Sequence, residues 1–325
     1  MLTRLVLAIA LATATAALPA NAQTYPTHSI SMIVPYPAGG VTDGLARLLA
    51  EHMKASLGQP VIVENVGGAG GSIGAGRVAR AAPDGYTILF GNAETHVFNA
   101  AVQTLQFDVV KDFEPIALMP RYPFILVTSN AVPAQNLKEL VAWIKANPAK
   151  VSQGTVGAGT VQHLCGLSMQ DMMGVRWQLV PYRGGAPAMQ DLLSGQINLM
   201  CTASGSFLPL IRNNQIRAYA VTTKERIVGA PDIPTVDEAG LPGLYVSVWN
   251  ALYAPKGTPK DAIDRLNTAA NAALADPTIQ RRVTVDMGLD MPAPNMRTPD
   301  ALGALQKAEI EKWWPIVKAA NVKAQ

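Results

Sequence analysis

The sequence lacks the common motifs of catalytic and metal sites. Its four histidines show neither the HExxH spacing nor another metal-ligand spacing, and no G-x-S-x-G motif marks a nucleophilic serine. His163 lies two residues from Cys165, but the sequence shows no third group that would orient this pair for nucleophilic attack. We therefore expect a protein that is not an enzyme and that holds no metal and no cofactor.

Nucleotide-binding motifs are also missing. No GK[ST] phosphate loop occurs, and the glycine-rich segment at 67–74 does not fit the dinucleotide motif G-x-G-x-x-G. Counted from Gly68, the sixth position is Ile73, and Gly74 comes one residue late. Five glycines in these eight positions instead indicate tight turns, close helix packing and a backbone that approaches a ligand.

Charged residues are scarce, at 15% of the chain, and no stripe of Lys and Arg with interleaved aromatic residues occurs. We therefore expect no nucleic-acid partner. The formal net charge of +3 gives a weak positive field, which slightly favours small anions. With 325 residues, of which 49% are hydrophobic, the chain can form two well-packed globular domains.

Long apolar runs are confined to the N-terminus. Arg4 precedes an apolar run at 5–18, which is shorter than the roughly 20 residues needed to cross a bilayer. Ala20-Asn21-Ala22 then has the small-x-small pattern of a signal-peptidase site. We expect residues 1–22 to be a cleaved signal peptide and the mature protein to be soluble and outside the cytoplasm.

The chain has only two cysteines, Cys165 and Cys201. In an oxidising compartment they could form one disulfide, or they could be two small buried thiols. Because a chain of this size does not need a covalent cross-link to be stable, we favour two buried thiols.

Short β-like runs alternate with amphipathic segments through the first half of the chain. Strands are expected at 30–34, 61–64 and 86–91. Thr42 is expected to cap the first helix, and a helix of small residues is expected at about 72–82. This βαβαβ order implies an α/β fold with a mostly parallel sheet covered by helices.

The second half repeats this alternation of strands and helices. Asn136 and Glu139 form a capping box at the start of a helix. The strands expected in this half are 151–154, 177–180, 197–201 and 217–222. Late helices are expected where a capping residue precedes a proline, at Thr258-Pro259, Asp276-Pro277 and Thr298-Pro299.

Two extended segments, near 113–126 and 245–255, connect the halves, and no Ser/Gly-rich linker separates them. Two crossings fit a chain that enters a second lobe and then returns to the first. We expect one lobe to comprise 23–120 plus 246–325 and the other to comprise 121–245. A pair of hinged lobes with a ligand cleft between them follows from this arrangement.

One loop motif occurs twice. VPYPAGG spans 34–40 and VPYRGG spans 180–185, and each follows an expected strand and precedes a helical pattern. Such a loop leaves backbone N–H groups free at a helix N-terminus, where anions bind well. The repeat predicts that two lobes close on one small anionic ligand, with Gly39 and Gly184 facing a shared cavity.

Several polar residues near these loops have both a binding and a structural interpretation. Arg183 could form two hydrogen bonds with a ligand carboxylate, or it could pair with Asp191. Asp43 is interpreted as a carboxylate of the first helical turn that favours the helix dipole. The hydroxyls of Thr155 and Thr160 could bind an anion or only cap a helix.

Short motifs in a fixed order along the chain indicate its family. They are IVPYPAGG at 33–40 with Asp43 and Arg47, LGQPV at 57–61, Glu64-Asn65, GAGG at 68–71, PDGYT at 83–87, PYRGG at 181–185, PTVDEAG at 234–240, Trp249 and Ala254-Pro255. Over essentially its whole mature length the chain resembles the extracytoplasmic solute receptors of tripartite tricarboxylate transporters, also called Bug receptors. The resemblance implies a two-lobed periplasmic binding protein of type II, which closes on a small organic acid and delivers it to membrane transporter subunits.

The resemblance also implies where the ligand binds. In the family, one ligand carboxylate rests on backbone N–H groups and waters between two first-lobe loops, which match 36–43 and 68–72 here. The residues expected to contact the ligand are Tyr36, Ala38, Gly39, Gly40, Thr42, Asp43, Ala69, Gly70, Ser72, Asn92, Thr95, Thr155, Gly159, Thr160, Tyr182, Arg183 and Gly184. The chain departs from the family at Val66-Gly67, which replaces a basic residue and a proline, so this loop is expected to be less rigid.

Ligand selectivity is expected to come from side chains at the far end of the ligand. Asn92, Glu94 and Thr95 follow a strand end, where open α/β sheets hold ligands, although they could also simply end the strand. Thr202 is a further candidate. Dicarboxylates, tricarboxylates, aromatic carboxylates and acidic amino acids all fit. The same sequence would suit a receptor that presents its ligand to a membrane sensor kinase, and a periplasmic enzyme acting on carboxylates is a more distant alternative.

Overall fold

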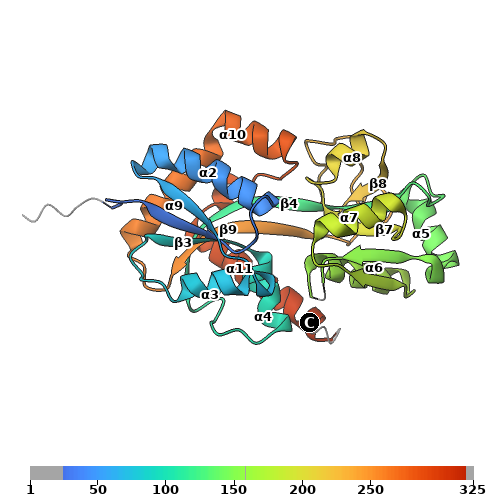
Figure 1. Cartoon of the computed structure of the whole chain (residues 1–325), viewed down its shortest axis with the longest axis horizontal. Coiled ribbons are helices and arrows are strands. Elements are labelled where there is room, and N and C mark those ends of the chain that lie inside the picture. The colour runs from blue at the N-terminus through green and yellow to red at the C-terminus, as the bar shows by residue number, and fades with distance from the viewer. Residues whose placement is uncertain (1–24, 158, 320–325) are drawn as a thin grey trace, which may run out of the picture.

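The protein has a mixed α/β fold in two lobes, which lie side by side along the long axis of the molecule (Figure 1). The computed structural model describes residues 25–319 except Ala158. The predicted signal peptide at 1–22 lies outside the described residues. No helix in the described part of the chain is both long enough and apolar enough to cross a membrane.

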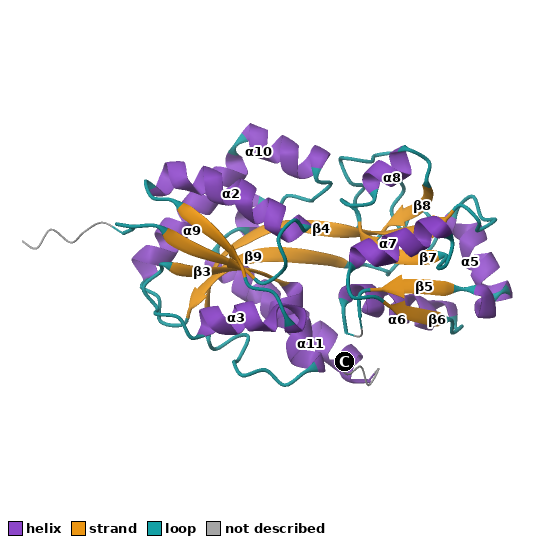
Figure 2. Cartoon of the chain, in the orientation of Figure 1, coloured by secondary structure: helices purple, strands orange, loops and turns teal. Residues whose placement is uncertain are grey.

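The first lobe is built on a parallel unit. Its N-terminal elements are β1 (Ile30–Val34), α2 (Val41–Leu57), β2 (Val61–Asn65), η1 (Ala69–Gly71), α3 (Ser72–Ala79), β3 (Thr87–Asn92), η2 (Glu94–Phe98) and α4 (Asn99–Val102). β1 pairs in parallel with both β2 and β3, as the βαβαβ pattern predicts. The strands are apolar because helices cover both faces of the sheet, with α2 on one side and α3 and α11 on the other (Figure 2).

Two long strands, β4 (Phe113–Ser129) and β9 (Ser247–Pro255), form the crossings between the lobes. β4 pairs antiparallel with β9 up to Pro123, and from Phe124 onward it pairs antiparallel with β7 and β8 of the other lobe. The two predicted extended segments are therefore strands. They make each sheet mixed, because antiparallel strands adjoin a parallel core of three strands, where the sequence pattern indicated mostly parallel sheets.

Prolines set the irregularities of β4. Its register with β9 shifts between Pro115 and Ala117 and again between Met119 and Arg121, on either side of Pro120. Because proline has no N–H to donate to the sheet, bulges are expected at such positions. At the second of these irregularities, the carbonyl oxygen of Pro120 accepts a hydrogen bond from the Asn250 side-chain amide at 2.6 Å.

The second lobe repeats the parallel core. Its elements are α5 (Leu137–Ala146), η3 (Pro148–Lys150), β5 (Ser152–Thr155), α6 (Val161–Met173), β6 (Gln178–Pro181), α7 (Gly185–Ser194), β7 (Leu199–Ala203), α8 (Leu208–Arg212) and β8 (Ile216–Val221). β5 pairs in parallel with β6 and β7.

Helices cover both faces of this second sheet. Ile125, Val127 and Met200 pack in one apolar cluster with α7, whereas Leu126 and Cys201 pack in the other cluster with α6. Alternate residues of a strand point to opposite faces, so α6 and α7 lie on opposite sides of the sheet.

The C-terminal part of the chain returns to the first lobe. It contains α9 (Lys260–Ala275), α10 (Pro277–Arg281), η4 (Arg282–Asp286), η5 (Pro294–Met296) and α11 (Pro299–Ala319). The two tryptophans of α11 anchor it there: the Trp313 ring packs edge-on against Phe98, and the Trp314 indole N–H donates to the Val97 carbonyl at 2.8 Å. These contacts support the proposed division into 23–120 plus 246–325 and 121–245.

The helix starts agree only in part with the sequence analysis. Asn136, Asp276 and Thr298 each accept a hydrogen bond from a backbone N–H of the following helix, as predicted. Thr42 does not cap α2, because the helix begins at Val41 and its cap position is Gly40. Thr258 does not cap α9 either, since its hydroxyl donates to the Pro255 carbonyl.

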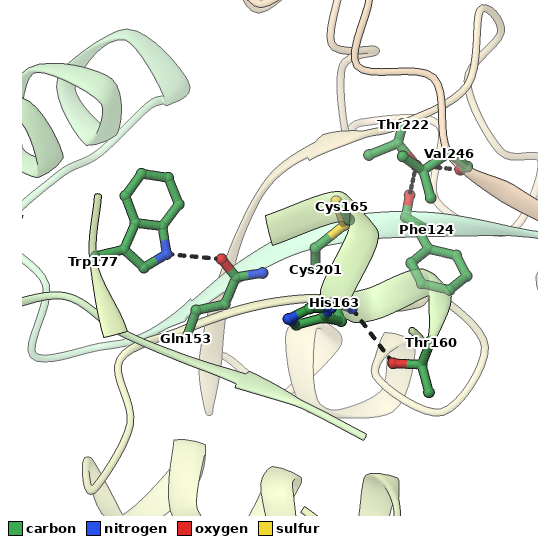
Figure 3. The surroundings of a disulfide bond; sticks show 9 residues. All are labelled: Phe124, Gln153, Thr160, His163, Cys165, Trp177, Cys201, Thr222 and Val246. Carbon is green, nitrogen blue, oxygen red and sulfur yellow. Dashed lines mark hydrogen bonds between the residues drawn. A yellow bond between two sulfur atoms is a disulfide. The ribbon is translucent and has the colours of Figure 1, made fainter. Parts of the chain in front are cut away.

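A disulfide joins Cys165 of α6 to Cys201 of β7, with the two Cα atoms 6.3 Å apart (Figure 3). The expectation of two free thiols was therefore wrong. Chain size bears only on the need for extra stability. It does not reveal that α6 packs on β7 with these two side chains facing each other.

Candidate ligand-binding cleft

A cavity of about 780 Å³ lies between the lobes and is lined by residues from both of them. Gly39 and Gly184, the two glycines that the repeated loop motif predicts to face each other, both line it. Of the residues expected to contact a ligand, those that line the cavity are Tyr36, Ala38, Gly39, Gly40, Thr42, Gly70, Thr160, Arg183 and Gly184. A cavity of this size suits a small organic molecule together with bound water.

The first loop is held by Asp43, which lies in the first turn of α2. Its carboxylate accepts hydrogen bonds from the Gly39 N–H at 2.9 Å, the Arg47 guanidinium and the Asn65 amide. Burial opposes ionisation of Asp43, but these three donors outweigh it and hold the pKa below its usual value. Asp43, a carboxylate of the first helical turn, therefore holds the loop in place. It accepts from the Gly39 N–H, which the loop motif was expected to leave free.

Donors remain at the N-terminus of α2. The first turn of a helix has N–H groups that lack partners within the helix, and Gly40, Val41 and Thr42 line the cavity at this point. The positive field of a 17-residue helix adds to their attraction for an anion. Backbone donors of α2 thus face the cleft even though the Gly39 N–H does not contribute.

The glycine-rich loop forms the neighbouring wall of the cavity, to which Gly68, Gly70 and Gly71 contribute. Gly71 has a φ of +91°, and a Cβ there would lie 2.8 Å from a Thr95 methyl carbon. Only glycine fits this position, so the loop can lie close against the turn that follows β3. Ala69 and Ser72 do not line the cavity, and the Ser72 hydroxyl accepts hydrogen bonds from two amide side chains of α4 and the residue after it.

The three polar residues at the end of β3 and just after it, Asn92, Glu94 and Thr95, do not have the same role. Asn92 is buried, and its side-chain oxygen accepts hydrogen bonds from the backbone N–H groups of Glu94 and Thr95. Thr95 is also buried and donates back to the Asn92 carbonyl. These two residues therefore end the strand, while Glu94 lines the cavity.

In the second lobe, Thr160 caps α6 and lines the cavity, whereas Thr155 and Gly159 do not. Thr155 is buried, and its carbonyl accepts a hydrogen bond from the Tyr182 N–H. A Cβ on Gly159 would lie 2.9 Å from a methyl carbon of Val102, which belongs to α4 of the first lobe. The two lobes are thus in contact beside the cavity.

The second copy of the loop motif lies at the N-terminus of α7. The Tyr182 hydroxyl donates to Asp191 at 2.6 Å, and burial together with this carboxylate raises the pKa of Tyr182 to about 12. Asp191 is therefore engaged by Tyr182 and not by Arg183, which rules out the structural pair considered for Arg183. Tyr182 does not line the cavity, whereas Arg183, Gly184 and Gly185 do.

Several residues that line the cavity were not predicted from the sequence. They are Tyr122 and Phe124 at the crossing of β4, Gln162 and Met189 in helices, and Ser206 and Phe207 after β7. No motif in the sequence identifies them, because their position at the cavity depends on how the elements of the two lobes pack together. Among the described residues, no group of three or more His, Cys, Asp or Glu side chains could hold a metal ion.

Two lobes joined by two crossing strands, with a cavity between them that residues of both lobes line, are the architecture of the two-lobed periplasmic binding proteins. A sequence profile of the tripartite tricarboxylate transporter family receptor, TctC, matches residues 45–322. The chain therefore belongs to this family of solute-binding receptors.

Individual relatives agree with this assignment. Protein BugT of Bordetella pertussis is 36% identical over 320 residues, which cover 98% of this chain and 97% of BugT. The solved structure of the periplasmic binding protein BugD is 40% identical, with a TM-score of 0.81, and the match covers 93% of this chain and all of that one. MatC from Rhodopseudomonas palustris, solved with bound malate, is 36% identical with a TM-score of 0.80, covering 90% of this chain and all of MatC.

Proposed function

We propose that this chain is a periplasmic receptor that binds a small organic carboxylate between its lobes and delivers it to a tripartite tricarboxylate-type membrane transporter. The observation that carries the proposal is the convergence of three helix N-termini on one cavity. They belong to α2 of the first lobe and to α6 and α7 of the second, and each helix has at least 10 residues.

This arrangement suits a carboxylate for electrostatic reasons. Helix N-termini offer N–H donors and a partial positive charge, and a carboxylate has two oxygens that accept from several donors at once. Arg183 adds a full positive charge in the same cavity. The malate bound to MatC is an acid of this class in a related receptor.

The rest of the cavity wall suits the body of an organic acid. Phe124, Met189 and Phe207 line it together with several prolines. Apolar groups of this kind cover carbon atoms of a ligand and exclude water, while the polar groups fix its orientation. Neither the backbone donors nor the apolar wall identifies one acid.

Ligand binding should favour the closed arrangement of the lobes. A carboxylate that contacts α2 and α7 at once bridges the lobes, so it binds the closed form better than an open one and shifts the population toward it. The membrane transporter would then distinguish loaded from empty receptor by the relative position of the lobes.

A thermal-shift screen tests the binding proposal. A ligand that binds only the folded protein at 100 times its Kd adds about 2.7 kcal/mol of stability, which should raise the melting temperature by roughly 5 °C or more. We expect at least one organic acid to do so, and neutral amides of the same acids to fail. A screen in which amides and acids act alike would contradict the proposal. Ligand-dependent cross-linking to the transporter subunits in membranes tests the delivery step.

A further inference from the structure

Two charged side chains line the cavity among the described residues, and they have opposite signs. Arg183 comes from the loop before α7 in the second lobe, and Glu94 comes from the turn after β3 in the first lobe. Asp43 lies nearby but is fully engaged by Gly39, Arg47 and Asn65. An acidic residue in the wall of a cleft for acids needs an explanation.

The hydrogen-bond partner of the Glu94 side chain is a donor. The Tyr36 hydroxyl donates to Glu94 Oε2 at 3.1 Å. The Tyr36 hydroxyl lies 2.9 Å from Asn92 Oδ1 as well, but that oxygen already accepts from the N–H groups of Glu94 and Thr95. The proton of Tyr36 is thus free to serve Glu94, which acts as an acceptor.

The carboxyl of Glu94 lies in the same cavity as the N-terminus of α6, since Glu94, Thr160 and Gln162 all line it. The backbone N–H of Val161, the first residue of α6, lowers the pKa of Glu94, so part of the attraction of this helix end for an anion is directed at the protein's own carboxyl. A second negative group of a ligand at this end would meet a like charge in place of a free donor.

We propose that the ligand is a carboxylate with a hydrogen-bond donor, such as an ammonium or hydroxyl group, directed at Glu94, and without a second carboxylate at that end. This inference rests on the proposed function and specifies its substrate class. The ligand carboxylate binds at the α2 and α7 N-termini with Arg183, and Glu94 accepts from the donor group at the other end.

The electrostatic surroundings of Glu94 agree with this assignment. Burial raises the pKa of Glu94, while the Tyr36 hydroxyl and the backbone N–H of Val161 lower it in part. The titratable groups that face it are Tyr36 and Tyr122, and the pKa of each lies far above neutral, chiefly because of burial. A cationic donor from a ligand would offset the desolvation of Glu94, whereas a plain dicarboxylate would increase the cost of its charge.

Four probes of equal chain length test the proposal: pentanoate, δ-hydroxypentanoate, δ-aminopentanoate and glutarate. Their Kd values are measured by calorimetry with the mature protein and with Glu94→Gln, which keeps the size and one acceptor but removes the charge. For the unmodified protein we expect both donor-bearing probes to bind more tightly than glutarate, by about tenfold or more. In Glu94→Gln the preference for the ammonium group over glutarate should fall by a similar factor.

Glu51→Gln is the matched control, because Glu51 is an exposed residue of α2. It should leave the order of the four probes unchanged. The inference is overturned if glutarate binds the unmodified protein as tightly as the donor-bearing probes, or if Glu94→Gln leaves the preference for the ammonium group over glutarate unchanged. If neither these probes nor any acid of the thermal-shift screen binds, the proposed function itself fails, and the inference fails with it.

Discussion

Closure of the lobes can be tested at Gly159, which lies where the lobes touch. A Cβ at this position would lie 2.9 and 3.1 Å from the two methyl carbons of Val102 in the other lobe. Overpacking of this kind typically costs about 1–3 kcal/mol. Because opening the lobes relieves the contact, the cost falls on the closed form, and we expect Gly159→Ala to raise the ligand Kd roughly 5- to 150-fold.

Gly157→Ala is the matched control for Gly159→Ala. Both glycines have positive φ, +116° and +80°, so alanine strains the backbone at each position by about 1–3 kcal/mol. No atom lies within 4 Å of a Cβ on Gly157, however, so only Gly159→Ala should affect closure. Calorimetry with the best acid of the screen gives Kd. The melting temperature of the ligand-free protein reports the backbone strain that both variants share.

A second substitution makes this test more specific. Val102→Ala removes both methyl carbons that a Cβ on Gly159 would meet. In the Gly159→Ala background it should restore most of the lost affinity without restoring the melting temperature. Equal loss of affinity in Gly157→Ala and Gly159→Ala, or no recovery with Val102→Ala, would refute the reasoning.

Three further perturbations address stability and binding. Replacing Cys165 and Cys201 together by alanine opens a loop with a sequence separation of 36 and should cost about 3–4 kcal/mol in urea unfolding; an unchanged midpoint would show that the bond contributes nothing. Asp43→Asn should cost about 1–3 kcal/mol at neutral pH, since it weakens hydrogen bonds to a buried carboxylate. The folded-state pKa of Asp43 is lowered, so its contribution is present above the unfolded pKa and is lost as pH falls through the folded pKa; melting temperatures of the two proteins should therefore converge in acid, and a constant gap would contradict this. Arg183→Ala should weaken carboxylate binding about tenfold with little change in melting temperature, whereas Arg176→Ala, at an exposed surface ion pair with Asp171, should change neither.

The sequence predicted the local elements of the fold well, because their signals are local. Strands β1, β2 and β3 fall within a residue or two of the expected ranges, and the capping box at Asn136 and Glu139 starts α5 as expected. Strand pairing is a long-range property. The pairing of β4 with β9 across more than 100 residues leaves no local pattern, so these segments were recognised as extended but not as antiparallel strands.

At the candidate site, too, the local features could be predicted and the long-range contacts could not. Glycine loops and helix N-termini are visible in the sequence, and the structure brings both copies of the motif to one cavity. The sequence does not show which acceptor a given donor meets. No motif indicated that Asp43 accepts from the Gly39 N–H, or that Asp191 pairs with Tyr182 and leaves Arg183 in the cleft. Which partner a donor or an acceptor meets depends on small differences in how the side chains pack.

The disulfide has a practical consequence for handling this protein. Cys165 lies one helical turn beyond Val161, and Cys201 immediately precedes Thr202, so the bond lies directly behind the part of the second lobe that faces the cleft. Protein produced in a reducing cytoplasm would lack this disulfide, and the second-lobe wall of its cleft would be less rigid. Binding constants measured on such preparations should be compared only after their thiol content has been determined, and export to an oxidising compartment is the better route for production.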